Sequence, residues 1–338
     1  MSATREAPIV SPADDTKGVL LQLVGSSRTR ARRRSSDPTT PPTQSHQVTA
    51  RRRPTGAATG SAPVTTDLTV ARTVCLRGRN LRVRLRCGTN PKPTPLLLCN
   101  GIGAAFDVLQ PFVDQLDPAI DIIRFDVPGV GGSPAPALPY RFSQLAVLVM
   151  RMVNELGYRD VDVLGFSWGG ALAQQIALQY PHRCRRLVLV STGTGSIMIP
   201  GNPFVLRKML TVRRFRDPEY AASLAGHLYG GSARTQRGKI QEAFASQRGI
   251  ASARGYLYQL AAGALWTSLP FLPFIRQRTL IMAGDDDPII PTANGRMMAR
   301  LMPNARLHIY QGGHVEIVSQ AAVLAPVISD FLKQPESS

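Results

Sequence analysis

The chain has 338 residues, of which 43% are hydrophobic and 18% are charged, a composition that suits one large α/β domain with an extension. No apolar run approaches the roughly 18 residues that a membrane-spanning helix needs, so a transmembrane segment is not expected. The formal net charge is +18, but no aromatic residue is interleaved with the arginine clusters, so we expect no specific nucleic-acid partner.

Residues 1–68 predict a disordered basic tail. The segment is rich in Ser, Thr, Pro and Arg, with arginine clusters at 28–34 and 51–53, and it has few large apolar side chains to offset the entropy of ordering. Its charge would suit contact with an anionic surface such as nucleic acid or lipid. We favour the simpler interpretation, a solvated tail or untranslated sequence in front of a later start codon.

Two features of the sequence indicate the compartment. The N-terminal region lacks the pattern of a secretory signal, because its apolar stretch, 18–24, is short and comes late. The cysteines Cys75, Cys87, Cys99 and Cys184 lack the paired spacing of a zinc site, and we expect them to be reduced. The sequence therefore predicts a cytoplasmic protein.

An alternation of strands and helices begins near residue 69. Residues 71–76 and 81–86 predict a β-hairpin, because the second segment alternates apolar residues with arginines. The later strands are short and nearly all apolar, which is typical of a parallel sheet buried on both faces. They are expected at 96–99, 120–125, 161–164, 187–190, 279–282 and 307–310, with helices at 105–116, 143–156, 169–180, 292–301 and 317–333. This order predicts a mostly parallel, doubly wound α/β sheet.

One long segment, residues 193–275, interrupts the alternation. It contains helical patches, prolines and a mixed apolar surface, and a connection of this length inside a compact domain usually carries function. We predict that it forms a helical lid over an active site. The α/β core then has two parts, residues 69–192 and 276–338.

A serine between glycines, in the sequence Gly-Phe-Ser-Trp-Gly at 165–169, lies between an apolar strand and a helical segment. This is the pattern of a nucleophile elbow, a turn so tight that side chains at the flanking glycine positions would collide. The turn exposes the serine Oγ, and the N-terminus of the next helix faces any negative charge that develops there. We therefore predict that Ser167 is the nucleophile of an acyl-bond hydrolase.

The acid and the base are expected after later strands, at the carboxyl edge where active-site residues of parallel sheets gather. Three adjacent aspartates follow the strand at 279–282. We choose Asp287, directly before the Pro-Ile-Ile turn, with Asp286 as the alternative, and we expect Asp285 and Asp286 to bond loop amides. His314, in a glycine-rich loop after the last strand, is the candidate base, because it completes the order Ser, Asp, His along the chain.

A glycine-rich turn at 100–104, after an early strand, indicates an oxyanion hole. The backbone N–H groups of Ile102 and Trp168 are expected to face the developing oxyanion, and one such donor is typically worth about 3 kcal/mol. Asn100 is assigned an orienting role only. The second glycine-rich segment, 126–133, lacks the Gly-Lys-Ser/Thr that would follow a phosphate cradle, so we interpret it as a tight loop near the site.

These residues define a mechanism of ester hydrolysis. His314 takes the proton of Ser167 as Oγ attacks the ester carbonyl, while Asp287 fixes the imidazole tautomer and stabilises its charged form. A water molecule activated by His314 then hydrolyses the acyl-enzyme. The mechanism needs no metal and no organic cofactor.

With these residues in place, the sequence over about 70–333 resembles the intracellular medium-chain-length poly(3-hydroxyalkanoate) depolymerases of the α/β-hydrolase superfamily. The resemblance rests on the strings at 100–104, 167–175, 229–231, 266–268 and 283–288. It implies the α/β-hydrolase fold, a catalytic triad at Ser167, Asp287 and His314, a storage polyester of 3-hydroxy fatty acids as substrate, and a place at the surface of an intracellular granule. The basic tail and the residues after His314, through Glu316, depart from the family's pattern.

Two other functions remain open from the residues alone. A carboxylesterase or lipase for small or monomeric hydrophobic esters would use the same triad, and an apolar lid suits it equally. A catalytically silent binding protein on the hydrolase fold is the alternative of another class, although the complete triad and oxyanion loop argue against it. Dehalogenases and epoxide hydrolases use an aspartate where this chain has Ser167, which argues against their chemistry.

Overall fold

The computed structural model describes residues 69–76, 78–89, 94–209, 218–236, 238 and 252–335. The tail predicted at 1–68 lies outside the described residues, as do 210–217 and most of 237–251 within the predicted lid segment. All of the described residues belong to one compact unit, Val64–Ser338.

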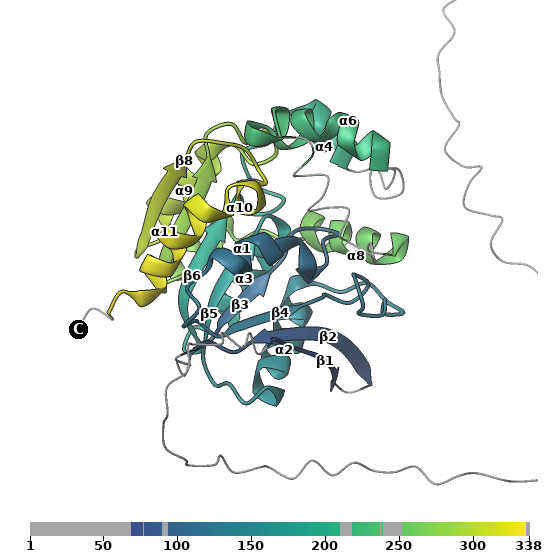
Figure 1. Ribbon diagram of the computed structural model, residues 1–338, viewed down its shortest axis with the longest axis vertical. Helices are drawn as coiled ribbons and strands as arrows, with labels where there is room; N and C mark the ends of the chain where they lie inside the picture. Colours follow the sequence, from purple (N-terminus) through teal and green to yellow (C-terminus); the bar gives the residue numbers. More distant parts are fainter. Residues whose placement is uncertain are drawn as a thin grey trace, which may run out of the picture. The chain divides into compact units, whose positions relative to one another are not determined.

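An eight-stranded sheet forms the centre of this unit (Figure 1). Its order is β1-β2-β4-β3-β5-β6-β7-β8; β1 and β2 form an antiparallel hairpin, β2 is antiparallel to β4, and the other neighbours are parallel. The strands are β1 (Thr69–Leu76), β2 (Arg79–Arg86), β3 (Leu96–Cys99), β4 (Ile122–Phe125), β5 (Val161–Phe166), β6 (Cys184–Val190), β7 (Arg278–Gly284) and β8 (Ala305–Tyr310). The predicted mostly parallel, doubly wound sheet is confirmed.

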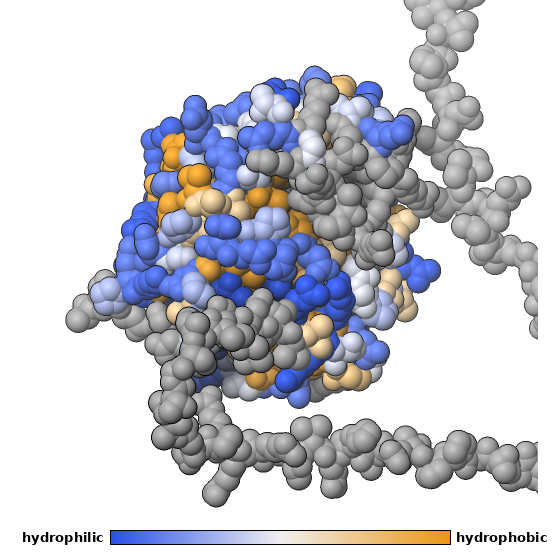
Figure 2. All heavy atoms as spheres, viewed as in Figure 1, coloured by the Kyte–Doolittle hydropathy of each residue, from blue (hydrophilic) through white to orange (hydrophobic). Residues whose placement is uncertain are grey.

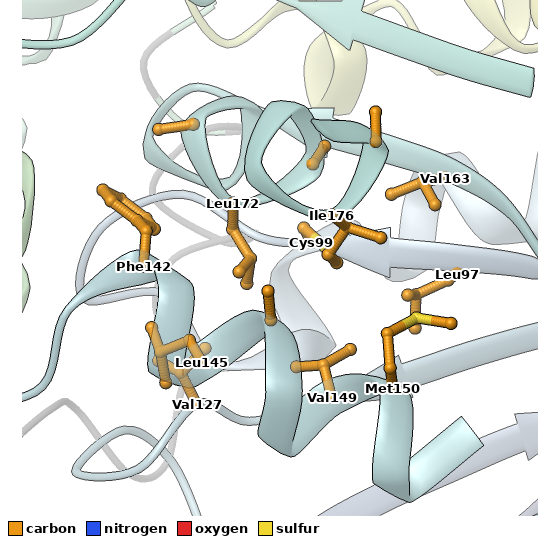
Figure 3. Packing of buried hydrophobic residues seen from close by; sticks show 14 of the residues in the cluster. Leu97, Cys99, Val127, Phe142, Leu145, Val149, Met150, Val163, Leu172 and Ile176 are labelled. Carbon is orange, nitrogen blue, oxygen red and sulfur yellow. The ribbon is translucent and has the colours of Figure 1, made fainter. Parts of the chain in front are cut away.

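The parallel strands other than β8 are buried on both faces, because alternate side chains of one strand enter different hydrophobic clusters. The strand predicted at 307–310 departs from this expectation: β8 is the edge strand and is partly exposed. In β3, Leu97 and Cys99 belong to one cluster, whereas Leu96 and Leu98 belong to the other. Figure 3 shows part of the first cluster, where Leu97 and Cys99 face apolar side chains of the covering helices. Burial on both sides explains why these strands have continuous apolar sequences rather than an alternating pattern.

Helices cover both faces of the sheet (Figure 1). The first cluster is covered by α2 (Phe142–Glu155), α3 (Trp168–Gln179) and α9 (Thr292–Leu301), and the second by α1 (Gln110–Gln115), α10 (Glu316–Ser319) and α11 (Ala321–Lys333). A short 3-10 helix, η1 (Phe106–Leu109), precedes α1. None of the helices in the described ranges combines the length and the apolar character needed to cross a bilayer.

Most predicted elements are present, with shifted bounds. The helix predicted at 292–301 has the bounds of α9, but the single helix predicted at 317–333 is divided into α10 and α11. The division falls at Gln320, whose φ of −120° and ψ of 36° lie outside the helical region. The strand predicted from residue 120 begins at Ile122, because Ile120 closes a turn by donating its N–H to the Asp117 carbonyl (3.1 Å).

The segment between β6 and β7 is largely helical in its described parts. It contains α4 (Pro203–Met209), α6 (Pro218–Tyr229), η2 (Gly231–Arg234), α8 (Ala253–Ala264) and η3 (Leu269–Phe274). In Figure 1, α4 and α6 lie together at the top of the view. The start of α8 is held to the loop after β4, because the Ser252 N–H donates to the Gly129 carbonyl (3.0 Å).

The carboxyl ends of β3 and β5 lie side by side in the middle of the sheet. The chain continues from β3 to a strand on one side, β4, and from β5 to a strand on the other side, β6. Such a switch point opens a crevice between the loops that follow the two strands. Here those loops are the glycine-rich turn 100–104 and the turn that contains Ser167.

Candidate active site

Ser167 occupies a strained turn between β5 and α3. Its φ of 53° lies in the left-handed region that non-glycine residues rarely adopt, and its N–H donates to the Val190 carbonyl (2.9 Å). The turn requires glycines: a Cβ on Gly169 would lie 2.1 Å from the Cys99 carbonyl oxygen, and one on Gly165 would lie 2.5 Å from the Gly169 carbonyl oxygen. The sequence therefore folds into a nucleophile elbow at this position.

His314 and Asp287 approach this serine from the loops after β8 and β7. His314 Nε2 lies 2.9 Å from Ser167 Oγ, and His314 Nδ1 lies 2.7 Å from Asp287 Oδ2. The other carboxylate oxygen of Asp287 accepts the N–H groups of Ile289 and Ile290, both at 2.9 Å. Both ring and carboxylate are buried, at 3% and 7% residue exposure. The structure thus brings the three predicted residues together in the geometry of a Ser–His–Asp relay.

The two neighbouring aspartates make different contacts. Asp286 accepts hydrogen bonds from the Arg234 guanidinium (2.8 and 3.1 Å) and from the Gly231 N–H (2.7 Å). The Arg234 guanidinium holds the pKa of Asp286 below its usual value. Asp285 accepts the N–H of Gly312 (2.8 Å). Asp286, the alternative acid, therefore faces a surface arginine rather than the imidazole.

The N–H groups predicted for the oxyanion hole belong to the loop after β3 and to the first residue of α3. Within the described part of the chain, neither the Ile102 N–H nor the Trp168 N–H has an acceptor. Asn100 orders the loop, because its Oδ1 accepts the Gly101 N–H (2.9 Å). The loop also lies against the candidate nucleophile, since a Cβ on Gly101 would be 3.6 Å from Ser167 Cβ. Two unengaged donors beside a nucleophile are what a developing oxyanion requires.

Glu316 organises the loop of His314, although the sequence marked it only as a departure from the family's pattern. The residue is fully buried and accepts the Gly313 N–H (2.9 Å), the Ser232 N–H (2.7 Å) and the hydroxyl groups of Ser232 and Ser319. Burial alone would raise its pKa, but these hydrogen bonds lower the pKa of Glu316 below its ordinary value of 4.5. Glu316 therefore ties the His314 loop to η2.

The segment 126–133 is a tight loop ordered by the carboxylate of Asp126. That carboxylate accepts the N–H groups of Phe106 (2.8 Å) and Gly132 (2.9 Å) and pairs with Arg82 (3.2 Å). Burial raises the pKa of Asp126, against the effect of these donors. The N–H groups of Gly129, Gly132 and Ser133 have acceptors within the segment itself, which suits a structural connection rather than a phosphate cradle.

A pocket of about 430 Å³ opens beside the candidate oxyanion donors. It is lined by Ile102, Trp168, Gln259, Leu260, Ala261, Gly263 and Ala264. Gly263 of α8 faces the indole, since a Cβ there would lie 3.6 Å from Trp168 Nε1, in ordinary van der Waals contact. The polar member of the lining, Gln259, has no signal in the sequence. A mostly apolar pocket at this place suits an apolar group attached to a carbonyl.

Comparisons with known proteins identify the family. Residues 94–318 match the family described as alpha/beta hydrolase fold, and the chain therefore belongs to the α/β-hydrolases and is a hydrolase. A poly(3-hydroxyalkanoate) depolymerase from Ectopseudomonas oleovorans is 46% identical over 265 residues, which make up 78% of this chain and 93% of that relative. 3-Oxoadipate enol-lactonase 2 from Acinetobacter baylyi is 23% identical over 239 residues, 71% of this chain and 88% of that relative. The resemblance carried by the motifs is confirmed.

Solved structures share the fold. An enol-lactonase from Burkholderia xenovorans LB400 has a TM-score of 0.68 at 21% identity, and it covers 78% of this chain and 100% of its own. A hydrolase from Pseudomonas aeruginosa PA01 has a TM-score of 0.67 at 24% identity, with 78% and 98% coverage. At these identities the likeness concerns the fold, and the prediction of an α/β-hydrolase fold is confirmed.

Proposed function

We propose that this protein is a carboxylic ester hydrolase that acts through an acyl-enzyme on Ser167, and that its substrate is a poly(3-hydroxyalkanoate). The observation that carries the proposal is the continuous chain of short contacts from Ser167 Oγ through His314 to Asp287. A hydroxyl in contact with a buried imidazole, itself held by a carboxylate, is the arrangement that activates serine for attack on a carbonyl.

The reaction begins when His314 Nε2 accepts the hydroxyl proton of Ser167 as Oγ attacks the ester carbonyl. Asp287 Oδ2 accepts the Nδ1–H of His314, which leaves Nε2 free to accept the proton and stabilises the imidazolium that forms. The N–H groups of Ile102 and Trp168 stabilise the oxyanion. His314 then returns the proton to the leaving alkoxide, and in the second half-reaction it activates water against the acyl-enzyme.

A polyester of 3-hydroxy acids suits the site for two reasons. The relative that is 46% identical over most of both chains is a poly(3-hydroxyalkanoate) depolymerase. The pocket beside the oxyanion donors is also mostly apolar, so it can take the alkyl side chain of one monomer while Ser167 attacks the carbonyl of that monomer. Medium-length alkyl side chains are the class that the sequence resemblance implies.

The segment 193–275 acts as a lid that contacts the polymer. Of the eleven exposed large hydrophobic residues in the described part of the chain, seven lie in this segment: Ile197, Ile199, Phe204, Leu257, Leu265, Phe271 and Phe274. On the face in Figure 2, apolar residues lie among mostly hydrophilic ones. Exposed apolar side chains gathered in one segment would offer contact area to an apolar polymer. They would suit a cytoplasmic enzyme associated with polyester granules.

A second candidate is an esterase for small or monomeric hydrophobic esters. The size of the pocket, about 430 Å³, favours this second candidate, because a single acyl chain would fill such a space. The two candidates share the nucleophile and differ in the acyl donor. A silent binding protein is disfavoured, because an assembled relay and two unengaged N–H donors have no role in simple binding.

The test compares wild-type protein with Ser167→Ala on two substrates. One is a series of p-nitrophenyl esters from acetate to laurate, and the other is amorphous poly(3-hydroxyalkanoate) granules, with released 3-hydroxy acids measured by chromatography. Wild-type protein should act on both, and the variant should lose kcat by about 10⁶-fold, as when a triad serine is removed. Near-normal activity of the variant would refute the serine mechanism, and activity on soluble esters alone would leave only the esterase.

A further inference from the structure

Gln259 contacts both segments that carry the proposed oxyanion donors. It lies on α8 and is 1% exposed. Its side-chain Oε1 accepts the backbone N–H of Gly103 (2.8 Å), and its backbone carbonyl accepts the indole Nε1–H of Trp168 (2.9 Å). These partners are 156 and 91 positions away in the sequence. One residue of the predicted lid segment is therefore bonded to the loop after β3 and to the start of α3.

The first bond fixes the direction of the Ile102 N–H. In this loop the Gly101 N–H donates to Asn100 Oδ1 (2.9 Å) and the Ala104 N–H donates to the Gly101 carbonyl (3.3 Å). The Gly103 N–H has its acceptor in Gln259. Of these successive groups only the Ile102 N–H has no acceptor within the described residues. The other bonds hold the peptide planes on both sides of it.

The second bond fixes the side chain of the other donor residue. The Trp168 ring packs on Phe142, with ring centroids 4.6 Å apart, and its indole nitrogen is held by the Gln259 carbonyl. Trp168 starts α3, so its backbone N–H belongs to the same residue as the ring that α8 holds. The position of α8 is thereby linked to the start of the helix behind Ser167.

Loss of the Gln259 side-chain acceptor would leave the Gly103 N–H buried without a partner. A buried unpaired N–H is unfavourable, so the loop would rotate toward another acceptor. Gly103 has a φ of 71°, which makes this peptide unit the turning point of the loop. Any rotation there would move the Ile102 N–H away from the oxyanion.

We propose that Gln259 is a positioning residue for the oxyanion hole, and that it couples the seating of α8 to the assembly of the catalytic site. The inference rests on the proposed function, because it assigns Ile102 and Trp168 to the oxyanion. When α8 is seated, the Gly103 N–H and the Trp168 indole are both engaged and the two donors converge. Displacement of α8 would break both bonds and loosen the oxyanion hole.

The test is Gln259→Met, which keeps the length and volume of the side chain and removes the acceptor. With a soluble p-nitrophenyl ester, kcat should fall by about 10- to 100-fold, less than the 10²- to 10³-fold cost of losing an oxyanion donor outright. KM should stay within about threefold, because the bond acts in the transition state. A trifluoromethyl ketone forms a tetrahedral alkoxide with serine. Its inhibition constant should rise by the same factor by which kcat/KM falls.

A matched control is Gln277→Met, the same exchange at another buried glutamine, whose Nε2 donates to the Ala177 carbonyl (2.9 Å). It should lower thermal stability without changing kcat or the inhibition constant. Gln259→Asn, which stays polar but withdraws the acceptor, covers the case in which the methionine variant does not fold, and its kcat should also fall.

A rise in KM with unchanged kcat would overturn the proposal, since Gln259 would then only line the pocket. Normal kcat in both Gln259 variants would overturn it too. These results are distinct from failure of the proposed function, which would appear as activity retained by Ser167→Ala.

Discussion

The exchange Asp287→Asn replaces one carboxylate oxygen by an amide nitrogen and tests the proposed relay in detail. In the structure, Asp287 Oδ1 accepts two backbone N–H groups, from Ile289 and Ile290, both at 2.9 Å. Oδ2 faces His314 Nδ1 at 2.7 Å. The two oxygens therefore have different duties, and the protein surrounding them decides how an amide would orient.

An asparagine at position 287 would keep its carbonyl oxygen toward Ile289 and Ile290, because the opposite orientation would set the NH₂ group against two N–H donors. The NH₂ group would then donate to His314 Nδ1, and the imidazole would carry its proton on Nε2. In that tautomer Nε2 cannot accept the proton of Ser167. The wrong tautomer in a Ser–His–Asp relay lowers kcat by about 10⁴-fold, or about 5.5 kcal/mol of activation free energy.

The assay is kcat for a soluble p-nitrophenyl ester near neutral pH, with thermal unfolding to verify that each variant is folded. Asp286→Asn is the matched control, because Asp286 lies one residue away and bonds Arg234 and the Gly231 N–H at a half-exposed position. The control should keep kcat within about threefold of wild type, since a surface ion pair contributes little. The assignment of the acid would be refuted if kcat fell by less than about 10-fold in Asp287→Asn, or if kcat fell further in Asp286→Asn than in Asp287→Asn.

Two further predictions concern stability and specificity. Glu316→Gln should lower the free energy of unfolding by about 1–3 kcal/mol near neutral pH, because hydrogen bonds to an ionised carboxylate are lost. The pKa of Glu316 is below 4.5 in the folded protein, so its contribution is complete above 4.5 and is lost as the pH falls through the folded value. Urea unfolding of both proteins should show their difference shrinking in acid, and a constant difference would contradict this. Ala264→Phe should fill the pocket and lower kcat/KM for p-nitrophenyl octanoate by about 10-fold or more relative to the acetate, and an equal change for both esters would mean that the pocket does not hold the acyl chain.

The sequence could predict the parts of this protein that depend on neighbouring residues. The strand at 96–99 and the helix at 292–301 have the predicted bounds, because a continuous apolar run and a helical spacing are local properties. The turn around Ser167 is local too, since a Cβ on Gly165 would lie 2.5 Å from the Gly169 carbonyl oxygen, four residues away. The break at Gln320 was missed, because nothing in the composition there ends a helix.

The order of the strands in the sheet and the choice between Asp286 and Asp287 depend on the tertiary structure, which the sequence does not give directly. Alternation of strands and helices indicates a parallel sheet, but it does not state which strands are neighbours. The structure sets β3 beside β5, which brings the loop of the proposed oxyanion hole to the turn of Ser167. It also directs Asp287 to His314 and Asp286 to Arg234. The sequence position of Asp287 before a proline suggested this distinction but could not establish it.

By itself, the sequence determined the α/β class, the elbow at Ser167 and the short set of residues from which an acid and a base could come. The tertiary structure alone decided that Gln259 meets Gly103 across 156 positions and that Glu316 gathers donors from a segment 84 positions earlier. The physical reason is the distance along the sequence over which each effect acts. Propensity and spacing act over a few residues, whereas a buried polar side chain finds its partners through the packing of whole helices against a sheet.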